Sequence, residues 1–273
     1  MNATSLSFAP AANVFSSMLT LEAVRQRAPA VFAPSPHERT SSKYTFIPTE
    51  RVLSGLMEAG FAPVEARQTQ ARRASPMHAR HIVRLRRRFE TVHLKDSVPE
   101  VVFLNSHDGT SSYQLRLAIF RVVCTNGLIV SRGAFPGIHV PHRGNVVDEV
   151  IAGALQIAGR FEGLALQVER MERRLLRLDE QLAFASRALA LRFPDVAESG
   201  MQPSQLLGVR RTDDVGEDLW STLNKVQENL IRGGLTRRTA TGRLTRTRGI
   251  TAIRRDVELN SRLWDLAAEV LAA

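Results

Sequence analysis

The 273-residue chain carries 37 basic and 27 acidic residues, for a formal net charge of +10, and 44% of its residues are hydrophobic. This composition excludes a disordered chain and allows one large folded domain or two smaller ones. The single cysteine, Cys124, excludes an intrachain disulfide, and the absence of a long apolar run predicts a soluble, cytoplasmic protein without a membrane partner.

The amino-terminal part predicts little regular structure. Residues 1–43 are rich in alanine, serine and proline, so we expect an arm or linker, with one or two helical turns over residues 18–27. Order is expected from Tyr44 onward. Pro48-Thr49-Glu50 then begins a helix that Gly60 ends, because Val52, Leu53, Leu56 and Met57 recur at helical spacing.

The following segment changes to the two-residue period of extended strands. Three strands are predicted: the first from partial alternation, the second from clear alternation and the third from a continuous apolar run. The fourth segment is ambiguous between strand and helix. An Asn-Gly pair predicts a type I′ hairpin, and a last short strand follows it. These segments are Pro63–Ala71, His78–Phe89, Val101–Leu104, Tyr113–Val123, the hairpin at Asn126-Gly127, and Ile138–Val140. We therefore expect residues 44–143 to form a helix and an antiparallel meander of five or six strands.

The strand predicted at His78–Phe89 has an unusual concentration of arginine. Because side chains alternate along a strand, one face would carry Arg80, Arg84, Arg86 and Arg88, and the other would turn His81, Val83 and Leu85 to a core. Like charges about 7 Å apart on one face repel, which an anion across them relieves. We interpret this face as a phosphate-binding surface; the alternative is a solvated edge strand whose arginines prevent strand pairing. Residues 46–143 hold 14 basic against 7 acidic residues, which supports the first interpretation.

The last part of the chain, residues 144–273, has helical periodicity. Apolar residues from Val147 to Leu178 predict one long helix, and three more are expected at 179–193, 214–231 and 257–271. The overall expectation is an α+β fold: helix, antiparallel sheet with a basic face, then long helices.

Between the last two helices lies a segment without any acidic residue, residues 235–255. It cannot bury enough apolar surface to order itself, so we expect a mobile cationic loop that closes over a polyanion; the alternative is a solvated loop without a partner. Its candidate nucleic-acid-binding residues are Arg237, Arg238, Arg243, Arg246 and Arg248.

Signals for catalysis are weak. Three loose histidine groups, His78 with His81, His107 beside Asp108, and His139 with His142, do not specify the three or four convergent ligands of a zinc site. Glu100 and Asp108 flank a strand, but no lysine follows at the spacing of a nuclease, and no phosphate-binding loop of an ATPase is present. We expect no catalytic residue, no metal and no cofactor.

Four separated motifs resemble those of the phage/plasmid-like protein family with a domain of unknown function. The likeness covers residues from about Thr20 to the carboxyl end, and implies a bacterial mobile-element setting without supplying any catalytic residue. The motifs are Tyr44-Thr45-Phe46-Ile47-Pro48-Thr49, Leu104-Asn105-Ser106-His107-Asp108-Gly109, Phe120-Arg121-Val122-Val123-Cys124-Thr125-Asn126-Gly127-Leu128, and residues 219–229.

The order of elements also resembles that of single-strand annealing proteins, an analogy of architecture alone. Annealing needs no active-site acid or metal, only neutralised phosphates and an extended strand. The leading hypothesis is therefore a non-enzymatic plasmid or phage protein that binds single-stranded DNA in recombination or replication and forms homo-oligomers, as rings or filaments.

Two other hypotheses stay open at this point. The basic surface could bind an acidic host protein, as an anti-defence or regulatory factor of a mobile element would. A metal-dependent nuclease is the third hypothesis. The sequence does not decide between DNA and RNA, or between single and double strands.

Overall fold

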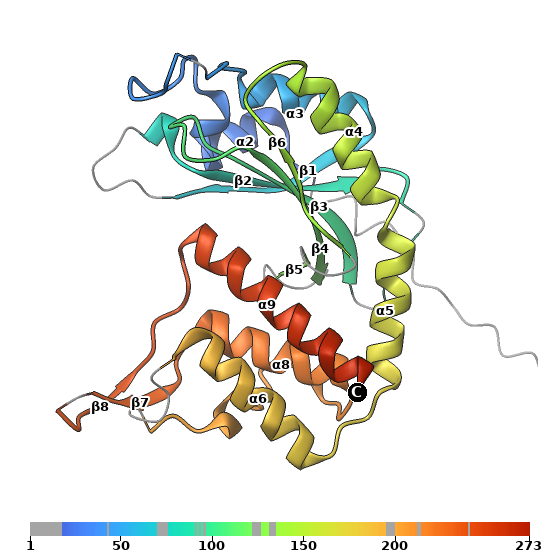
Figure 1. Ribbon diagram of the computed structural model, residues 1–273, viewed down its shortest axis with the longest axis vertical. Helices are drawn as coiled ribbons and strands as arrows, with labels where there is room; N and C mark the ends of the chain where they lie inside the picture. Colours follow the sequence, from blue (N-terminus) through green and yellow to red (C-terminus); the bar gives the residue numbers. More distant parts are fainter. Residues whose placement is uncertain are drawn as a thin grey trace, which may run out of the picture.

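The computed structural model describes residues 18–42, 44–69, 76–90, 92, 94, 97–121, 127–130, 135–194, 200–211, 214–239 and 241–273. The upper part is an antiparallel sheet covered by helices. The lower part is helical, and its first helix, α5 (Phe161–Arg173), connects it to the upper part (Figure 1). The predicted α+β class is confirmed. Among the described residues, no helix combines the length and apolar character needed to cross a membrane.

The sheet is a meander of β1 (Phe61–Gln68), β2 (His81–Arg87), β3 (Ser97–Asn105), β4 (Tyr113–Arg121) and β5 (Gly127–Val130), with neighbours antiparallel. A sixth strand, β6 (Ile138–Val140), pairs with the other end of β4. Phe120 pairs with Gly127, so residues 121–126 lie between them. Gly127 is therefore a paired strand residue and not the second residue of the predicted two-residue turn at Asn126-Gly127, so that prediction is wrong for Gly127; Asn126 lies outside the described residues.

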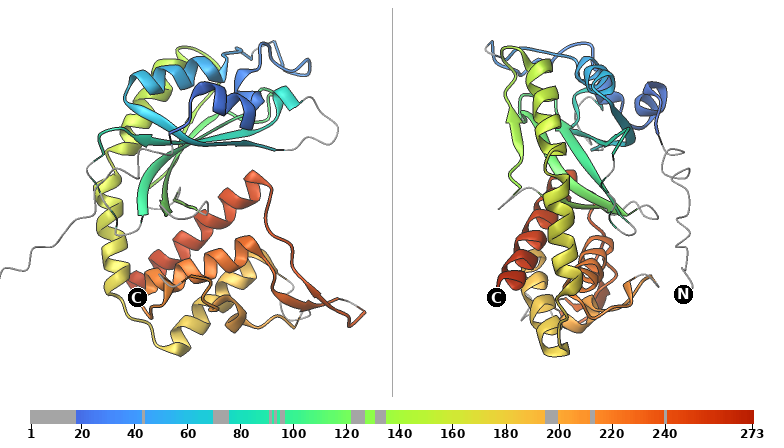
Figure 2. Two further views of the ribbon diagram at one scale, coloured as in Figure 1. Left: turned by 180° about the vertical axis from the view of Figure 1, so that it is seen from behind. Right: turned by 90° about the vertical axis from the view of Figure 1, so that its right-hand side faces the viewer.

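One face of the sheet carries the larger core. Helices α2 (Leu21–Arg27), α3 (Thr49–Glu58) and α4 (Val146–Ala158) and the short turns η1 (Pro29–Phe32) and η2 (Pro76–His78) lie on this side (Figures 1 and 2). Val83, Leu85 and His81 of β2 are fully buried here, as the alternation predicted. Val24 and Val31 are also fully buried, so the described residues 18–42 pack on the sheet and do not form the expected arm.

The lower part contains α5 (Phe161–Arg173), α6 (Leu178–Arg192), η3 (Pro203–Leu206), α8 (Leu219–Arg232) and α9 (Ile253–Ala272). The single long helix predicted from Val147 to Leu178 is wrong: α4 ends at Ala158, α5 begins at Phe161, and Gly159 lies between them. Glycine is a poor helix former, and the break lets α5 turn its apolar residues to the lower core.

The segment predicted as a mobile cationic loop contains an antiparallel hairpin of β7 (Thr236–Arg238) and β8 (Leu244–Arg246). Gly233 ends α8 with a φ of 72°, and a Cβ there would lie 2.7 Å from the backbone of Arg248. Only glycine fits this position. Bonds from Thr236 N to Gln205 Oε1 and from Leu235 N to Thr247 Oγ1 hold the base of the hairpin.

The second face of the sheet meets α9. Ile253 and Val257 at the start of α9 pack on a small apolar cluster formed by Ile82, Val102, Leu104, Ala118, Phe120 and Ile129. This contact places the amino terminus of a 20-residue helix against the sheet face on which the arginines of β2 were predicted.

Candidate nucleic-acid interface

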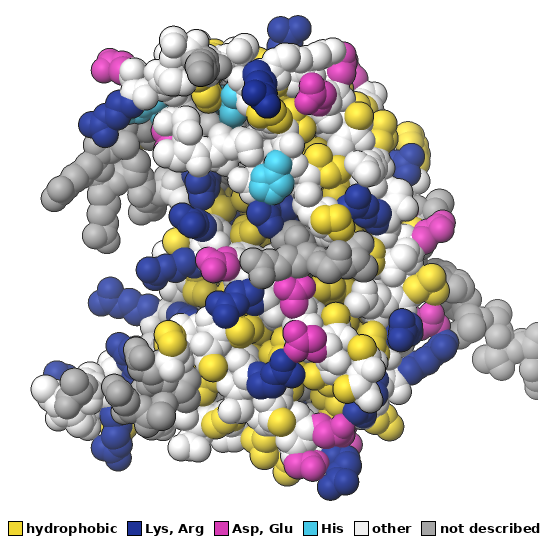
Figure 3. All heavy atoms as spheres, viewed as in Figure 1, with side chains coloured by type: hydrophobic (Ala, Val, Ile, Leu, Met, Phe, Trp, Pro, Cys, Tyr) yellow, Lys and Arg dark blue, Asp and Glu magenta, His cyan; other side chains and the backbone are white. Residues whose placement is uncertain are grey.

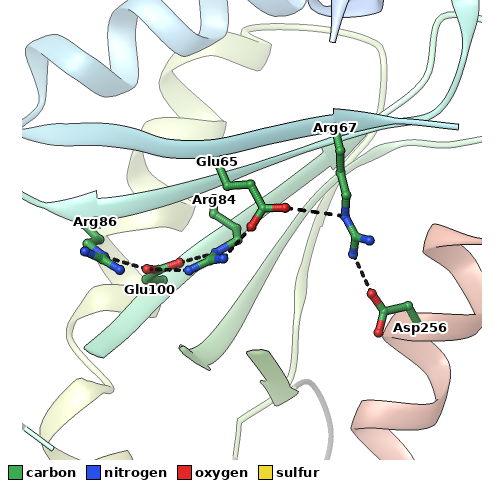
Figure 4. A network of polar contacts seen from close by, with 6 residues as sticks. All are labelled: Glu65, Arg67, Arg84, Arg86, Glu100 and Asp256. Atoms are coloured by element: carbon green, nitrogen blue, oxygen red, sulfur yellow. Dashed lines mark hydrogen bonds and ion pairs between the residues drawn. The ribbon is translucent and has the colours of Figure 1, made fainter. Parts of the chain in front are cut away.

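The two central arginines of β2 are neutralised by carboxylates of the same chain. Arg84 Nε and Nη2 lie 2.6 and 3.0 Å from the two carboxylate oxygens of Glu100, and Arg86 Nε lies 2.6 Å from Glu100 Oε1 (Figure 4). Arg84 also pairs with Glu65, and its guanidinium lies 3.3 Å above the ring of Phe120. Arg84 and Arg86 are 7% and 8% exposed, so the prediction that they line a phosphate-binding groove is wrong.

The polar chain continues from the sheet to α9. Glu65 Oε1 lies 3.9 Å from Arg67 Nε, and Arg67 Nη2 lies 2.5 Å from Asp256 Oδ2 in the first turn of α9 (Figure 4). Burial lowers the pKa of Arg84, but Glu100 and Glu65 outweigh burial and leave that pKa raised. Three guanidinium groups thus face three carboxylates, and this network joins the two parts of the fold.

The other two predicted arginines of this strand lie apart. Arg88 is exposed in the turn after β2. Arg80, just before β2, is partly buried and faces a cavity between the sheet and α9. The four arginines therefore do not form one surface.

A basic cleft surrounds the first half of α9. A cavity of about 470 Å³ between the sheet and α9 is lined by Arg80, Arg116 and Arg254. A second cavity, also of about 470 Å³, shares Arg80 and Arg254 and adds Arg39. A third, of about 460 Å³, shares Glu258 with the first and lies between the ends of α6 and α9; its arginines are Arg192, Arg255 and Arg262. We call these three adjoining cavities the α9 cleft.

The charge of the α9 cleft is strongly positive. Its lining holds seven arginines and two carboxylates, Asp108 and Glu258. Within the described residues, six of these arginines make no ion pair with a carboxylate: Arg39, Arg80, Arg192, Arg254, Arg255 and Arg262. Figure 3 shows Lys and Arg side chains gathered along the band between the sheet and the lower helices.

Burial and the crowding of positive charges lower the pKa of two residues that line the cleft. Burial lowers the pKa of Arg192, and the positive charge of Arg255 lowers it further. Burial and the positive charge of Arg116 likewise lower the pKa of His139, which lines the first cavity. An anion bound in the cleft would relieve this repulsion.

Backbone groups add to the positive potential. The second cavity reaches Ala252 and Ile253, the N-cap and first residue of α9, and the N-cap makes no side-chain hydrogen bond to the helix start. The first amides of a helix lack intrahelical partners and lie at the positive end of its dipole. Their position beside Arg39, Arg80 and Arg254 favours an anionic ligand.

The predicted arginines of the hairpin lie outside the α9 cleft. Arg237, Arg238, Arg243 and Arg246 are exposed on β7, β8 and their connection, and Arg248 is exposed after β8. Of the nine predicted binding residues, only Arg80 lines the cleft. The other six arginines of the cleft were not predicted, because they come from segments far apart in the sequence. Only Arg254 and Arg255 are adjacent in the sequence, so only they form a local cluster of charge.

A buried polar network fixes the start of α3 on the sheet. Thr49 Oγ1 lies 3.0 Å from His81 Nε2, 2.9 Å from His107 Nε2 and 2.9 Å from Asn105 Nδ2. His142 Nε2 lies 2.9 Å from Asn105 Oδ1. Burial is the main cause that lowers the histidine pKa values, to about 4 for His81, about 3 for His107 and about 4 for His142.

The protons of this network can be assigned from its partners. His81 Nδ1 lies 3.0 Å from the carbonyl of Ala79, so Nδ1 carries the proton and Nε2 accepts from the Thr49 hydroxyl. His107 and Asn105 then donate to Thr49, which leaves His107 Nδ1 as a buried acceptor without a partner. These histidines act as neutral hydrogen-bonding groups.

The part of the chain that the structure describes contains no cluster of three metal-ligating side chains. No three His, Cys, Asp or Glu side chains there are placed to hold a metal ion. Glu100 is engaged by Arg84 and Arg86, and Asp108 accepts hydrogen bonds from Ser106 and Thr110. The two carboxylates considered for a nuclease therefore have structural partners.

Comparisons with known proteins give a family without an assigned activity. Residues 36–264 match the Domain of unknown function (DUF932). Two proteins of Escherichia coli (strain K12) are similar: UPF0380 protein YfjQ, 42% identical, and UPF0380 protein YafZ, 41% identical, each over 254 residues that cover 93% of this chain and 92% of the relative. No solved structure matches. The extent of both likenesses shows that this chain belongs to the DUF932 family.

Proposed function

We propose that the protein binds nucleic acid without enzymatic activity and holds the phosphates of an extended single strand in the α9 cleft. The observation that carries this proposal is the convergence of seven arginines on three adjoining cavities that contain only two carboxylates. Phosphate contacts supply most of the affinity of non-specific nucleic-acid binding.

The shape of the cleft favours a single strand. Arg80, Arg116 and Arg192 are partly buried between the sheet and the helices, and the other four cleft arginines are exposed beside them. Proteins that read duplex DNA instead insert a protruding helix or ribbon into a groove. A single strand is flexible enough to enter such a recess. Aromatic residues make up only 6% of the chain, so contacts to phosphates are expected to outweigh base stacking.

The setting we propose is recombination or replication on a bacterial plasmid or phage, with the protein acting in the cytoplasm. Support for this setting comes from the resemblance of the four sequence motifs alone. Annealing of complementary strands is the most concrete activity that fits a phosphate-binding cleft without an active-site acid or metal.

Fluorescence anisotropy with a labelled single-stranded oligonucleotide across a salt series tests the assignment. For single strands the salt slope is about −0.7 per phosphate contact, so the variant R80A/R254A/R255A should lose about 2 from the slope and bind more weakly at low salt. The matched control R27A/R51A/R170A removes three exposed arginines from α2, α3 and α5, and should retain most of the affinity.

Two results would remove the proposal. Unchanged affinity of the cleft variant would show that these arginines do not contact the strand. An equal loss in the control variant would show that net charge alone governs binding. Incubation with DNA and magnesium or manganese separately checks the absence of nuclease activity, because intact DNA is expected.

A further inference from the structure

The β7–β8 hairpin is a basic projection with no role in the α9 cleft. Its four arginines, Arg237, Arg238, Arg243 and Arg246, are exposed, and Leu244 between them is 61% exposed. Residues 235–255 contain no acidic residue that could balance them. The exposed arginines favour an acidic partner surface, and Leu244 beside them is available for an apolar contact with it.

A groove of complementary character lies along α5. It has a volume of about 490 Å³ and is lined by Val92, Leu94, Ala165, Leu166 and Val168, with three glutamates at its rim. Leu166 is 61% exposed. Glu162, Glu169 and Glu172 share this face of α5 with Leu166, because they recur at helical spacing. We call this surface the α5 groove.

Glu162 and Glu169 of the α5 groove remain available to a partner. Glu169 pairs with Arg173 on the same helix, but both side chains are largely exposed, at 49% and 76%. Such a surface pair contributes little and can exchange partners. Within the described residues, Glu162 makes no ion pair.

The two surfaces cannot meet within one molecule. α5 runs along one side of the fold, and the hairpin projects from the opposite side, as both the front and the back views show (Figures 1 and 2). A contact between them must therefore join two copies.

We propose that the hairpin of one copy docks into the α5 groove of a second copy. Leu244 packs on the apolar floor beside Leu166, and the hairpin arginines pair with Glu162 and Glu169. Because the two surfaces differ, the contact is head-to-tail, and repetition produces a closed ring or an open filament. The inference does not depend on the proposed function, since none of these residues lines the α9 cleft.

The test is a charge exchange read by sedimentation velocity on the full-length protein without nucleic acid. The wild-type protein should show concentration-dependent oligomers. The groove variant E162R/E169R and the hairpin variant R237E/R243E should each sediment as smaller species. An equimolar mixture of the two should regain oligomers, because each kind of reversed surface meets its complement. The control E58R/E149R reverses two exposed glutamates on α3 and α4 and should assemble like the wild type.

A further variant tests whether the apolar contact, and not charge alone, contributes to assembly. L244D introduces a charge at the apolar centre of the contact and should reduce assembly without rescue by either partner variant. A monomeric wild type at all concentrations, or a mixture that stays dissociated while circular dichroism shows folded chains, would overturn the proposal. Loss of single-strand binding by R237E/R243E with assembly unchanged would instead assign the hairpin to nucleic acid.

Discussion

At the scale of single residues, Glu100 is a buried carboxylate that compensates the charges of two buried arginines. Its side chain is fully buried and accepts hydrogen bonds from Arg84 and Arg86. Removing one member of a buried ionic network leaves the remaining charges without compensation, which costs far more than the network contributes over an apolar replacement. The stability of the sheet face toward α9 therefore depends on this one carboxylate.

We expect E100Q to lower the free energy of unfolding by about 3–5 kcal/mol, because two buried guanidinium groups lose their shared counter-charge. Urea denaturation followed by circular dichroism measures it. E65Q is the matched comparison and should cost less, since Glu65 is 25% exposed and contacts only one of the two buried guanidinium groups. Equal stabilities of E100Q and the wild type would contradict the network.

At the scale of elements, the polar network that fixes α3 to the sheet should make stability depend on pH. His81, His107 and His142 have pKa values of about 4, 3 and 4, against 6.5 for an unperturbed histidine. Between pH 6.5 and about 4 the unfolded chain binds more protons than the folded one, so stability is highest above pH 6.5 and falls as the pH drops.

The expected fall approaches roughly 1 kcal/mol per pH unit for each histidine that is fully buried, and less for His142, which is partly accessible. Denaturant titrations from pH 7 to pH 4.5 provide the slope. H142N should reduce this slope, whereas H37N, which changes a histidine outside the network, should leave it intact. A slope that is the same in H142N and the wild type would remove His142 from the explanation.

The sequence predicted the elements better than their partners. Alternation in β2 correctly separated the core face of Val83 and Leu85 from the arginine face, because the two-residue period is local. The partners Glu65 and Glu100 lie on the neighbouring strands β1 and β3, and only the register brings them within reach of Arg84. A charge pattern on one strand does not show what covers it.

At the scale of the whole molecule, the α9 cleft exists only because the lower helical part folds back onto the sheet. Arg80 precedes β2, Arg116 lies in β4, Arg192 in α6, and Arg254 and Arg255 in α9. No local period in the sequence links these positions. Segment-level charge counts pointed to the sheet region, but the site needs the packing of Ile253 and Val257 on the second face of the sheet.

A substitution of Glu258 should raise the affinity for a single strand, whereas the arginine substitutions should lower it. Glu258 is exposed and lines two of the three cavities, so its carboxylate repels any polyanion in the cleft. E258Q removes one negative charge at nearly constant shape, and should tighten single-strand binding about fivefold near 0.1 M salt, the equivalent of one more neutralised phosphate. E58Q, on α3, should not change affinity. A damaged fold weakens binding and cannot strengthen it, so the gain would locate the strand beside α9; weaker or unchanged binding in anisotropy titrations would place it elsewhere.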